Sequence, residues 1–292
     1  MEGAVFCQFV LSGLSSGAIY ALIALGFGVV ENATGIVNFA QGEFLVLGAF
    51  ATFSLLGAHL PYPLALGGGL LSAALVGLAL ERLVLARARS RETLILVFIT
   101  VGASIFLRGI IKELWGKRPL ALPPLFGEEP LHFHGLSLDV QNLGILFIAL
   151  LAFFLLHLFF RYTLWGKAMR AVAVDPSTAA LMGIPVPWVV AGSFVLAGAL
   201  GGLAGILIAP VSPLSFDSGV VIGLKGFSAA VLGGYGHFGG ALLGGLILGL
   251  LESLSAYFVS SAYKNIIAFA ILVLVLLFRP EGLLGQRKGE RL

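Results

Sequence analysis

Long apolar runs separated by short polar stretches constrain this 292-residue chain more than any other feature of its sequence. A helix that crosses a membrane needs about 20 mainly apolar residues, because the hydrocarbon core is about 30 Å thick. Apolar segments of roughly this length occur at residues 9–30, 36–56, 63–86, 94–112, 143–160, 188–209, 216–233, 238–256 and 264–279. We therefore predict an all-α fold, a polytopic transmembrane helical bundle, formed by residues 1–292 as a single domain.

Composition supports a membrane bundle in which some helices are interrupted. Charged residues make up 11% of the chain, whereas a soluble domain averages about 25%. The 40 glycines suit helices that approach closely, because small residues let membrane helices pack tightly. Polar or glycine-rich stretches interrupt segments 36–56 and 216–256. We therefore predict about eight or nine membrane segments, some of them broken or re-entrant.

Basic residues gather in three clusters that predict how the chain is oriented. Cytoplasmic loops of membrane proteins carry an excess of Lys and Arg. The clusters are Arg82, Arg87, Arg89 and Arg91; Arg161, Lys167 and Arg170; and Arg279, Arg287, Lys288 and Arg291. Placing all three in the cytoplasm is self-consistent, and three full N-terminal spans would then put the amino terminus outside. A re-entrant second segment would put it inside. Four other basic residues would lie near the outer face and count against this orientation, namely Arg108, Lys112, Lys117 and Arg118.

The polar stretch 161–187, which this orientation places in the cytoplasm, has the signals of a short helix. Asp175 can cap the first turn with its carboxylate, Pro176 suits the first helical position, and Gly183 suits the left-handed residue after the end. A helix of about two turns has little stability alone and usually forms against a partner. We expect a docking element for a soluble subunit, with an ordinary connecting loop as the alternative.

Several polar side chains interrupt the apolar segments. Asn38, Gln41 and Glu43 form one group, and an ionisable residue at membrane depth is a functional candidate because its burial is costly. We expect the group to face a subunit interface on the substrate pathway; hydrogen bonding between helices is the structural alternative. Lys225 and Glu252 are interpreted as residues near membrane boundaries, where a lysine side chain can reach the headgroups.

The sequence contains no pattern typical of an enzyme or a metal site. It has no HExxH, no G-x-S-x-G and no phosphate-binding P-loop, so ATP hydrolysis is not expected in this chain. His132 and His134 lie in a proline-rich loop at 113–142 without a nearby third ligand type, and Cys7 is the single cysteine. We predict no metal, no cofactor and no nucleic-acid partner. His237, in a glycine-rich turn, is interpreted as a turn residue or as a polar group on the pathway.

Six stretches, taken together and in order, connect the chain to a known family. They are GLSSGAIYALIALGFGVV (13–30), GIVNFAQGE (35–43), ERLVLARARS (81–90), RYTLWGKAMRAVAVDPSTAALMGI (161–184), GFSAAVLGGYGHFGGALLGGLILGLLE (226–252) and YKNIIAFAILVLVLLFRPEGLLG (263–285). The chain resembles the permease subunits of bacterial ABC importers for branched-chain amino acids, a family related to ribose permeases. It departs from the family at Gln41, where His is common, and at Glu31–Thr34, which replaces a more apolar stretch.

The resemblance implies a multi-pass protein of the bacterial inner membrane that translocates leucine, isoleucine or valine. An external substrate-binding protein would deliver the amino acid, a second homologous permease would complete the pathway, and two cytoplasmic ATPases, with their own ATP and Mg²⁺, would drive it. The helix that begins at Pro176 would couple to one ATPase. Arg170 and Asp175 would be its polar anchors, and Ala179, Ala180 and Gly183 would allow close approach.

Three other functions remain open. Urea, short amides or other amino acids are alternative substrates within the same family. An ion-coupled secondary transporter would need paired carboxylates within the membrane. A channel or scaffold would not need the docking helix.

Overall fold

The computed structural model describes residues 2–90, 92–127, 131–133, 136–279 and 281–285. Its α-helices are α1 Glu2–Thr34, α2 Gln41–Gly57, α3 Tyr62–Ala79, α4 Thr93–Trp115, α5 Val140–Tyr162, α6 Leu164–Val174, α7 Pro176–Leu181, α8 Val186–Ile208, α9 Ser218–Gly233, α10 Phe238–Phe258 and α11 Lys264–Phe278. A π-helical turn, Leu80–Leu85, extends α3, and a 3₁₀ turn, Ser261–Tyr263, precedes α11. A small antiparallel hairpin pairs β1 Leu131–Phe133 with β2 Leu136–Leu138.

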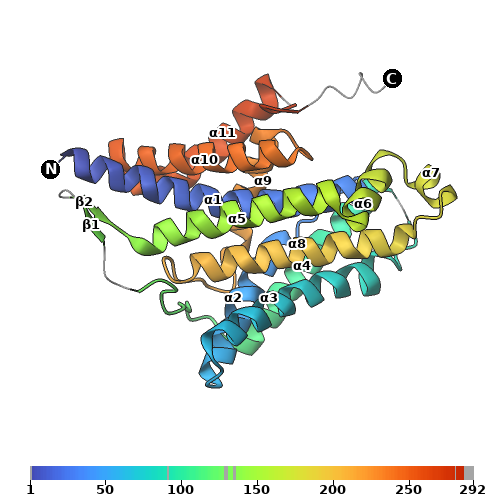
Figure 1. Ribbon diagram of the computed structural model, residues 1–292, viewed down its shortest axis with the longest axis horizontal. Helices are drawn as coiled ribbons and strands as arrows, with labels where there is room; N and C mark the ends of the chain where they lie inside the picture. The colour runs from blue at the N-terminus through green and yellow to red at the C-terminus, as the bar shows by residue number, and fades with distance from the viewer. Residues whose placement is uncertain (1, 91, 128–130, 134–135, 280, 286–292) are drawn as a thin grey trace.

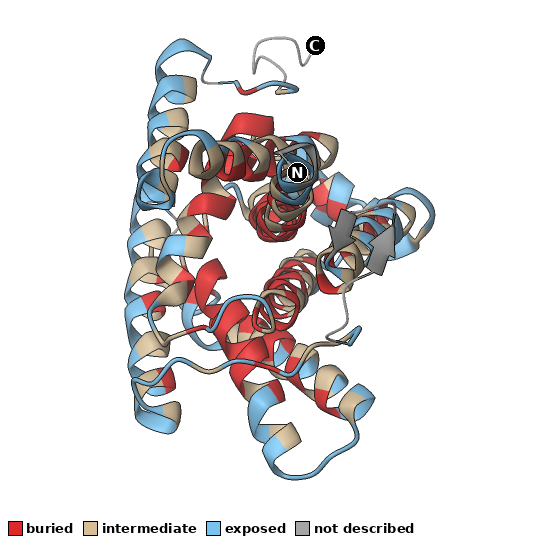
Figure 2. Ribbon diagram, turned by 90° about the vertical axis from the view of Figure 1, so that its left-hand side faces the viewer, coloured by how far each residue is buried: buried red, intermediate tan, exposed pale blue. Residues whose placement is uncertain are grey.

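Each of the nine apolar segments forms a helix, which confirms the all-α polytopic fold. Among the described residues, seven helices are long and apolar enough to cross a membrane, and α2 and α9 are shorter apolar helices. Most of the long helices run lengthwise through the molecule, with α1 near the middle (Figure 1). Within the apolar stretch of α1, 89% of the residues are buried. Buried residues concentrate in the central helices in the end view (Figure 2), so α1 is the core around which the others pack.

The interruptions predicted in segments 36–56 and 216–256 are present as breaks between helices. Residues 35–40 are not helical, and α2 begins only at Gln41. Gly35 has a φ of 71°, a conformation that glycine adopts without steric cost. A turn at residues 234–237 separates α9 from α10, and both Gly234 and Gly236 have positive φ. Glycine conformation therefore explains why these apolar segments are not single long helices.

Glycines bring α1 and α10 into backbone contact. A Cβ atom at Gly249 would lie 2.3 Å from the backbone nitrogen of Gly17, and a Cβ atom at Gly245 would lie 2.6 Å from that of Ala21. Both distances are far below van der Waals contact. The glycine-rich sequence of α10 is therefore a helix-packing surface, as small residues in membrane helices generally are.

The two ends of the bundle differ in character. The end with α6, α7 and the start of α4 is called the basic end, because Arg87, Arg89, Arg161, Lys167 and Arg279 come from segments that meet there (Figure 1). The start of α1 and the β1–β2 hairpin lie at the opposite end, called the hairpin end. The described residues of the three basic clusters thus lie at the same end of the bundle. The described residues do not include Arg91, Arg287, Lys288 or Arg291.

Candidate functional site

Asn38, Gln41 and Glu43 are enclosed by the chain itself. Their exposed fractions are 0%, 0% and 1%. The expectation that this group faces a subunit interface therefore differs from the structure, because helices of the same chain cover all three side chains. None of them faces hydrocarbon, in keeping with the cost of burying polar groups in lipid.

Asn38 and Gln41 make contacts that hold the break before α2 in place. The Oδ1 of Asn38 accepts a hydrogen bond from the backbone N–H of Ala40 at 3.1 Å. The Nε2 of Gln41 donates to the carbonyl oxygen of Ala197 on α8 at 2.9 Å. Gly26 of α1 makes room for the Gln41 amide, since a Cβ atom there would lie 2.1 Å from Nε2. These contacts tie α1, α2 and α8 together and suit a structural role.

Glu43 instead points to α4 and forms a charged cluster there. Its Oε1 accepts hydrogen bonds from Ser104 Oγ at 2.9 Å and from Arg108 Nη2 at 3.4 Å. Arg108 Nη2 also donates to Ser104 Oγ at 3.3 Å. The second carboxylate oxygen, Oε2, has no hydrogen-bond partner among the described residues. Among Asn38, Gln41 and Glu43, only Glu43 is charged, and its Oε2 could still accept a hydrogen bond.

Ser104 and Arg108 were not identified as site residues from the sequence. In the sequence, Arg108 was considered only as one of four basic residues near the predicted outer face, which argue against the predicted orientation. Its pairing with Glu43 explains its position inside an apolar segment. The spacing of Ser104 and Arg108, four residues apart on one helix face, was the available signal, but the partner helix was not evident from the sequence.

A second charged cluster corrects the interpretation of Lys225 and Glu252. Lys225 Nζ lies 2.8 Å from Glu252 Oε1, with side chains only 8% and 9% exposed. The hydroxyl of Tyr20, on α1, donates to Glu252 Oε2 at 2.8 Å. The Lys225 side chain therefore does not reach toward lipid headgroups, because its ammonium group pairs with Glu252 inside the bundle. The cluster joins α1, α9 and α10.

The stretch 161–187 contains two helices, where one was expected. Thr163 caps α6 by accepting a hydrogen bond from the backbone N–H of Gly166 at 2.9 Å. Asp175 caps α7 by accepting from the N–H of Ser177 at 2.9 Å, as predicted. Hydrogen bonds from the Ser177 and Thr178 hydroxyls lower the pKa of Asp175 from 3.8 to about 2. Gly183 has a φ of 83°, which confirms its left-handed position after the helix.

The exposed surface of this segment is more apolar than expected. Ala179 is buried against the chain and so does not belong to an outer contact face, whereas Arg170, Pro176, Ala180 and Gly183 are exposed. Leu181 and Met182 are 88% and 79% exposed. Two neighbouring apolar side chains at the end of a short capped helix are therefore exposed on the surface of this chain. They were visible in the sequence as apolar residues inside the polar stretch.

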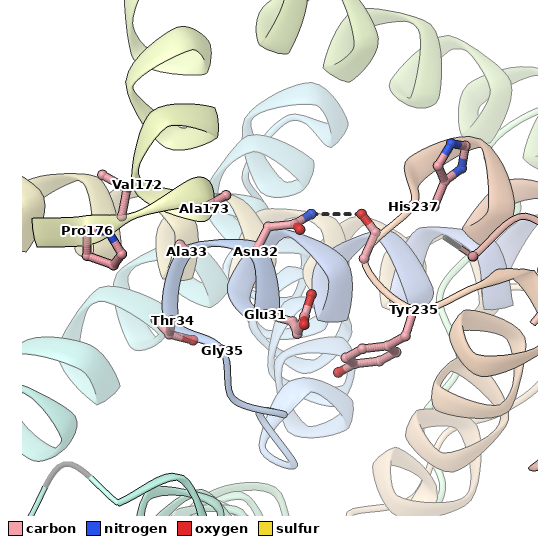
Figure 3. A pocket seen from close by; sticks show the side chains of 12 residues that line it. Glu31, Asn32, Ala33, Thr34, Gly35, Val172, Ala173, Pro176, Tyr235 and His237 are labelled. Carbon is pink, nitrogen blue, oxygen red and sulfur yellow. Dashed lines mark hydrogen bonds between the residues drawn. The ribbon is translucent and has the colours of Figure 1, made fainter. Parts of the chain in front are cut away.

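A cavity opens at the basic end, next to α7. It measures about 610 Å³, and Glu31, Asn32, Pro176, Tyr235 and His237 are among its lining residues (Figure 3). Asn32 Nδ2 donates to the carbonyl oxygen of Gly236 at 2.9 Å. His237 Nδ1 accepts from the N–H of Gly240 at 3.0 Å and caps α10. His237 is thus a satisfied turn residue, one of its two expected roles.

No metal site is evident in the described part of the chain. Among these residues, no group of three or more His, Cys, Asp or Glu side chains could hold a metal ion. His134 lies outside the described residues, and the side chain of His132 is not described. The prediction that the chain binds no metal stays a prediction.

Comparison with known proteins decides the family. Residues 9–276 match the family model described as branched-chain amino acid transport system / permease component. The chain is 35% identical over 300 residues to the high-affinity branched-chain amino acid transport system permease protein LivH of Escherichia coli K12, covering 98% of this chain and 97% of the relative. The chain belongs to this family.

Other relatives agree with this assignment to the branched-chain permease family. The protein BraD of Pseudomonas aeruginosa, also named a high-affinity branched-chain amino acid transport system permease protein, is 33% identical over 98% of each chain. The ribose import permease protein RbsC of Escherichia coli K12 is 28% identical, over 90% of this chain and 83% of the relative. Among solved structures, PsaBC from Streptococcus pneumoniae in complex with Fab has a TM-score of 0.51 at 13% identity, covering 94% of this chain and 93% of that chain. That likeness concerns the fold alone.

Proposed function

We propose that this chain is the permease subunit of an ATP-driven importer for leucine, isoleucine and valine in the bacterial inner membrane. A substrate-binding protein on the outer side would deliver the amino acid to this chain and a second, homologous permease. Two cytoplasmic ATPases would bind ATP and Mg²⁺, and this chain would hold no cofactor and bind no nucleic acid. The observation that carries the proposal is the 35% identity to a branched-chain amino acid permease over 98% of the chain.

The exposed helix α7 would couple the membrane domain to one ATPase. The helix is capped at both ends and lies at the basic end, which the excess of Lys and Arg assigns to the cytoplasm. Leu181 and Met182 would supply an apolar contact surface, and the exposed Arg170 of α6 would supply a charge. An ATPase that binds this surface differently with and without ATP would shift the balance between two permease states.

Two details of the structure bear on the alternatives. Gln41, the departure from the family pattern, bonds to the backbone of Ala197 and is fully buried, so it does not contact a substrate in this state. An ion-coupled transporter would need carboxylates that share a site. Glu43 and Glu252 each face a basic residue instead.

Reconstitution of the complete complex tests the proposal. We expect proteoliposomes with both permeases, both ATPases and the cognate binding protein to accumulate labelled leucine when ATP is enclosed with the ATPases. A matched complex with hydrolysis-deficient ATPases should accumulate none. Uptake of urea or acetamide without leucine uptake would contradict the substrate, and leucine uptake without the ATPases would contradict the ATP-driven mechanism.

A further inference from the structure

A small cavity of about 130 Å³ lies between α4, α9 and the end of α1, beside the Glu43–Arg108 pair. Its apolar lining consists of Phe27, Phe39, Val101, Ile105, Val220 and Leu224. Since a water molecule occupies about 30 Å³ in the liquid, the space suits a molecule with few heavy atoms. The lining suits an aliphatic group of that molecule.

Two residues connect this cavity to the carboxylate of Glu43. Ser104 lines the cavity and donates to Glu43 Oε1 at 2.9 Å. Gly219 lines it as well, and a Cβ atom there would lie 3.1 Å from Glu43 Oε2. The buried Oε2, which has no hydrogen-bond partner among the described residues, therefore lies close to the backbone of Gly219, although Glu43 itself does not line the cavity. A buried carboxylate oxygen without a donor is costly, so a positive charge held close to it in the cavity is favoured.

Arg108 extends the same surface by one helical turn. Val101, Ser104, Ile105 and Arg108 follow the i, i+3, i+4, i+7 spacing of one helix face, and the first three line the cavity. The Arg108 side chain is 28% exposed, and its Nε has no hydrogen-bond partner among the described residues. One bond at 3.4 Å to Glu43 and one at 3.3 Å to Ser104 leave most of the guanidinium donors free.

The position of Arg108 indicates that this face does not contact lipid. Arg108 precedes Trp115, the end of α4, by seven residues, or about 10 Å at about 1.5 Å per residue. A partly exposed guanidinium at that depth would be expensive in hydrocarbon, and such residues generally face a water-filled pathway or another polar group. Only 22% of the residues in the apolar stretch of α4 are buried within the chain, and the charge of Arg108 indicates that the exposed surface next to it faces a polar pathway.

We propose that this cavity is a substrate site that recognises a zwitterionic amino acid with an aliphatic side chain. Arg108 would bind the carboxylate through its planar donor fork. Ser104 Oγ, which lines the cavity and donates to Glu43, would accept a hydrogen bond from the ammonium group, and the Glu43 carboxylate behind it would supply the opposite charge. The aliphatic side chain would fill the apolar lining. This inference rests on the proposed function and adds that the permease itself selects for both charges of the substrate.

A labelling experiment on the assembled complex tests the site without altering its charges. Cys7 is replaced by Ser, Val220 in the cavity is replaced by Cys, and the rate of reaction with a thiol reagent is measured without binding protein. We expect leucine to slow the reaction. Leucinamide, which lacks the carboxylate, and 4-methylpentanoate, which lacks the ammonium group, should require about tenfold to hundredfold higher concentrations, the effect of losing one hydrogen bond to a charged group. In a matched control, Ile110→Cys on another face of α4, leucine should leave the rate unchanged.

A second arm tests the role of Arg108 directly. In the Val220→Cys background, Arg108→Gln should abolish protection by leucine, and Arg108→Lys should weaken it, because lysine retains the charge without the planar fork. Lys112→Gln, which removes a charge one turn further along α4, should leave protection intact. Co-purification of the partner subunits verifies assembly. If the Arg108→Gln complex does not assemble, the comparison of protection by leucine and by its two analogues tests the proposed site without this variant.

The outcomes separate this inference from the proposed function. Equal protection by leucine and both analogues, or no protection in a complex that transports leucine, would overturn the site and leave the function intact. Protection that persists in assembled Arg108→Gln would also overturn it. A complex that transports no branched-chain amino acid would contradict the proposed function instead.

Discussion

At the scale of single residues, the charged side chains inside the bundle are the main result. Lys225 and Glu252 are buried and paired at 2.8 Å, and the Tyr20 hydroxyl completes the carboxylate's hydrogen bonds. Burying such a pair is costly, and removing one partner leaves an uncompensated charge. The pair therefore constrains how α1, α9 and α10 pack, because each charge requires the other helix in place.

Substitution of this pair should be strongly non-additive. We expect Lys225→Met or Glu252→Leu alone to destabilise the purified permease by about 3–5 kcal/mol, and the double substitution to restore much of the loss. Thermal unfolding in detergent measures the effect, with Leu251→Met, at an exposed neighbouring position, as the control. Losses that simply add in the double variant would show that the two charges do not stabilise each other.

At the scale of an element, α7 shows how local sequence signals create an exposed helix. Its cap residue, Asp175, accepts a hydrogen bond from the backbone N–H of Ser177. Gly183, which follows the helix, has a positive φ that residues other than glycine adopt only at an energetic cost. Nothing lies within 4 Å of the position of a Cβ atom at Gly183. Any effect of a substitution there would come from backbone conformation, not from a collision.

The end of α7 should be sensitive to backbone conformation. Gly183→Val is expected to strain the left-handed position by about 1–2 kcal/mol and to lower ATP hydrolysis by the reconstituted complex. Gly183→Asn, which tolerates this conformation, is the matched control and should retain most of the activity. If the Gly183→Val complex hydrolysed ATP and imported leucine at wild-type rates, α7 would be only a connecting segment.

Blocking the outer face of the same helix should separate coupling from membrane assembly. Ala180→Trp places a large side chain on an exposed position beside Leu181, so we expect the ATPases to co-purify poorly while the two permeases still associate. An unchanged yield of ATPase with Ala180→Trp would count against α7 as the contact.

The cap of α7 should also respond to pH in a defined direction. Because the pKa of Asp175 is lowered from 3.8 to about 2, the ionised cap stabilises the helix fully above the ordinary pKa. This contribution is lost as the pH falls through about 2. Coupling should therefore not change through titration of Asp175 between about pH 5 and 8. Asp175→Asn should retain the cap, and Asp175→Ala should lose it; equal ATPase activity in both variants would argue against the cap.

At the scale of the whole molecule, the long helices run between two ends of different character. The basic end carries α6 and α7, and the hairpin end carries the start of α1 and β1–β2 (Figure 1). The short helix α2 runs from the break at residues 35–40 toward the connection before α3. This arrangement agrees with three N-terminal passages and an amino terminus on the side opposite α7.

Labelling in intact cells should confirm which side is which. In a Cys7→Ser background, Leu60→Cys, between α2 and α3, should react with an impermeant thiol reagent added outside. Ser177→Cys, in α7, should react only after the cells are opened. Reaction of Ser177→Cys from outside would reverse the orientation and remove the basis for docking on a cytoplasmic ATPase.

The amino-acid sequence by itself determined the features that depend on neighbouring residues. The nine apolar segments, the breaks at their glycines, the clustering of basic residues and the caps at Asp175 and Gly183 were all predictable, because hydropathy and capping act over a few residues. Helix α6 was missed, since its amphipathic stretch was interpreted as part of a polar loop.

Only the tertiary structure decided which charged and polar side chains meet. Glu43 pairs with Arg108 from a helix 65 residues away, and Lys225 pairs with Glu252 on the next helix. The same packing encloses Asn38 and Gln41, which were candidates for the pathway because they are polar residues within an apolar segment. Such contacts depend on how each helix is rotated and placed against its neighbours, and no short stretch of sequence determines that geometry.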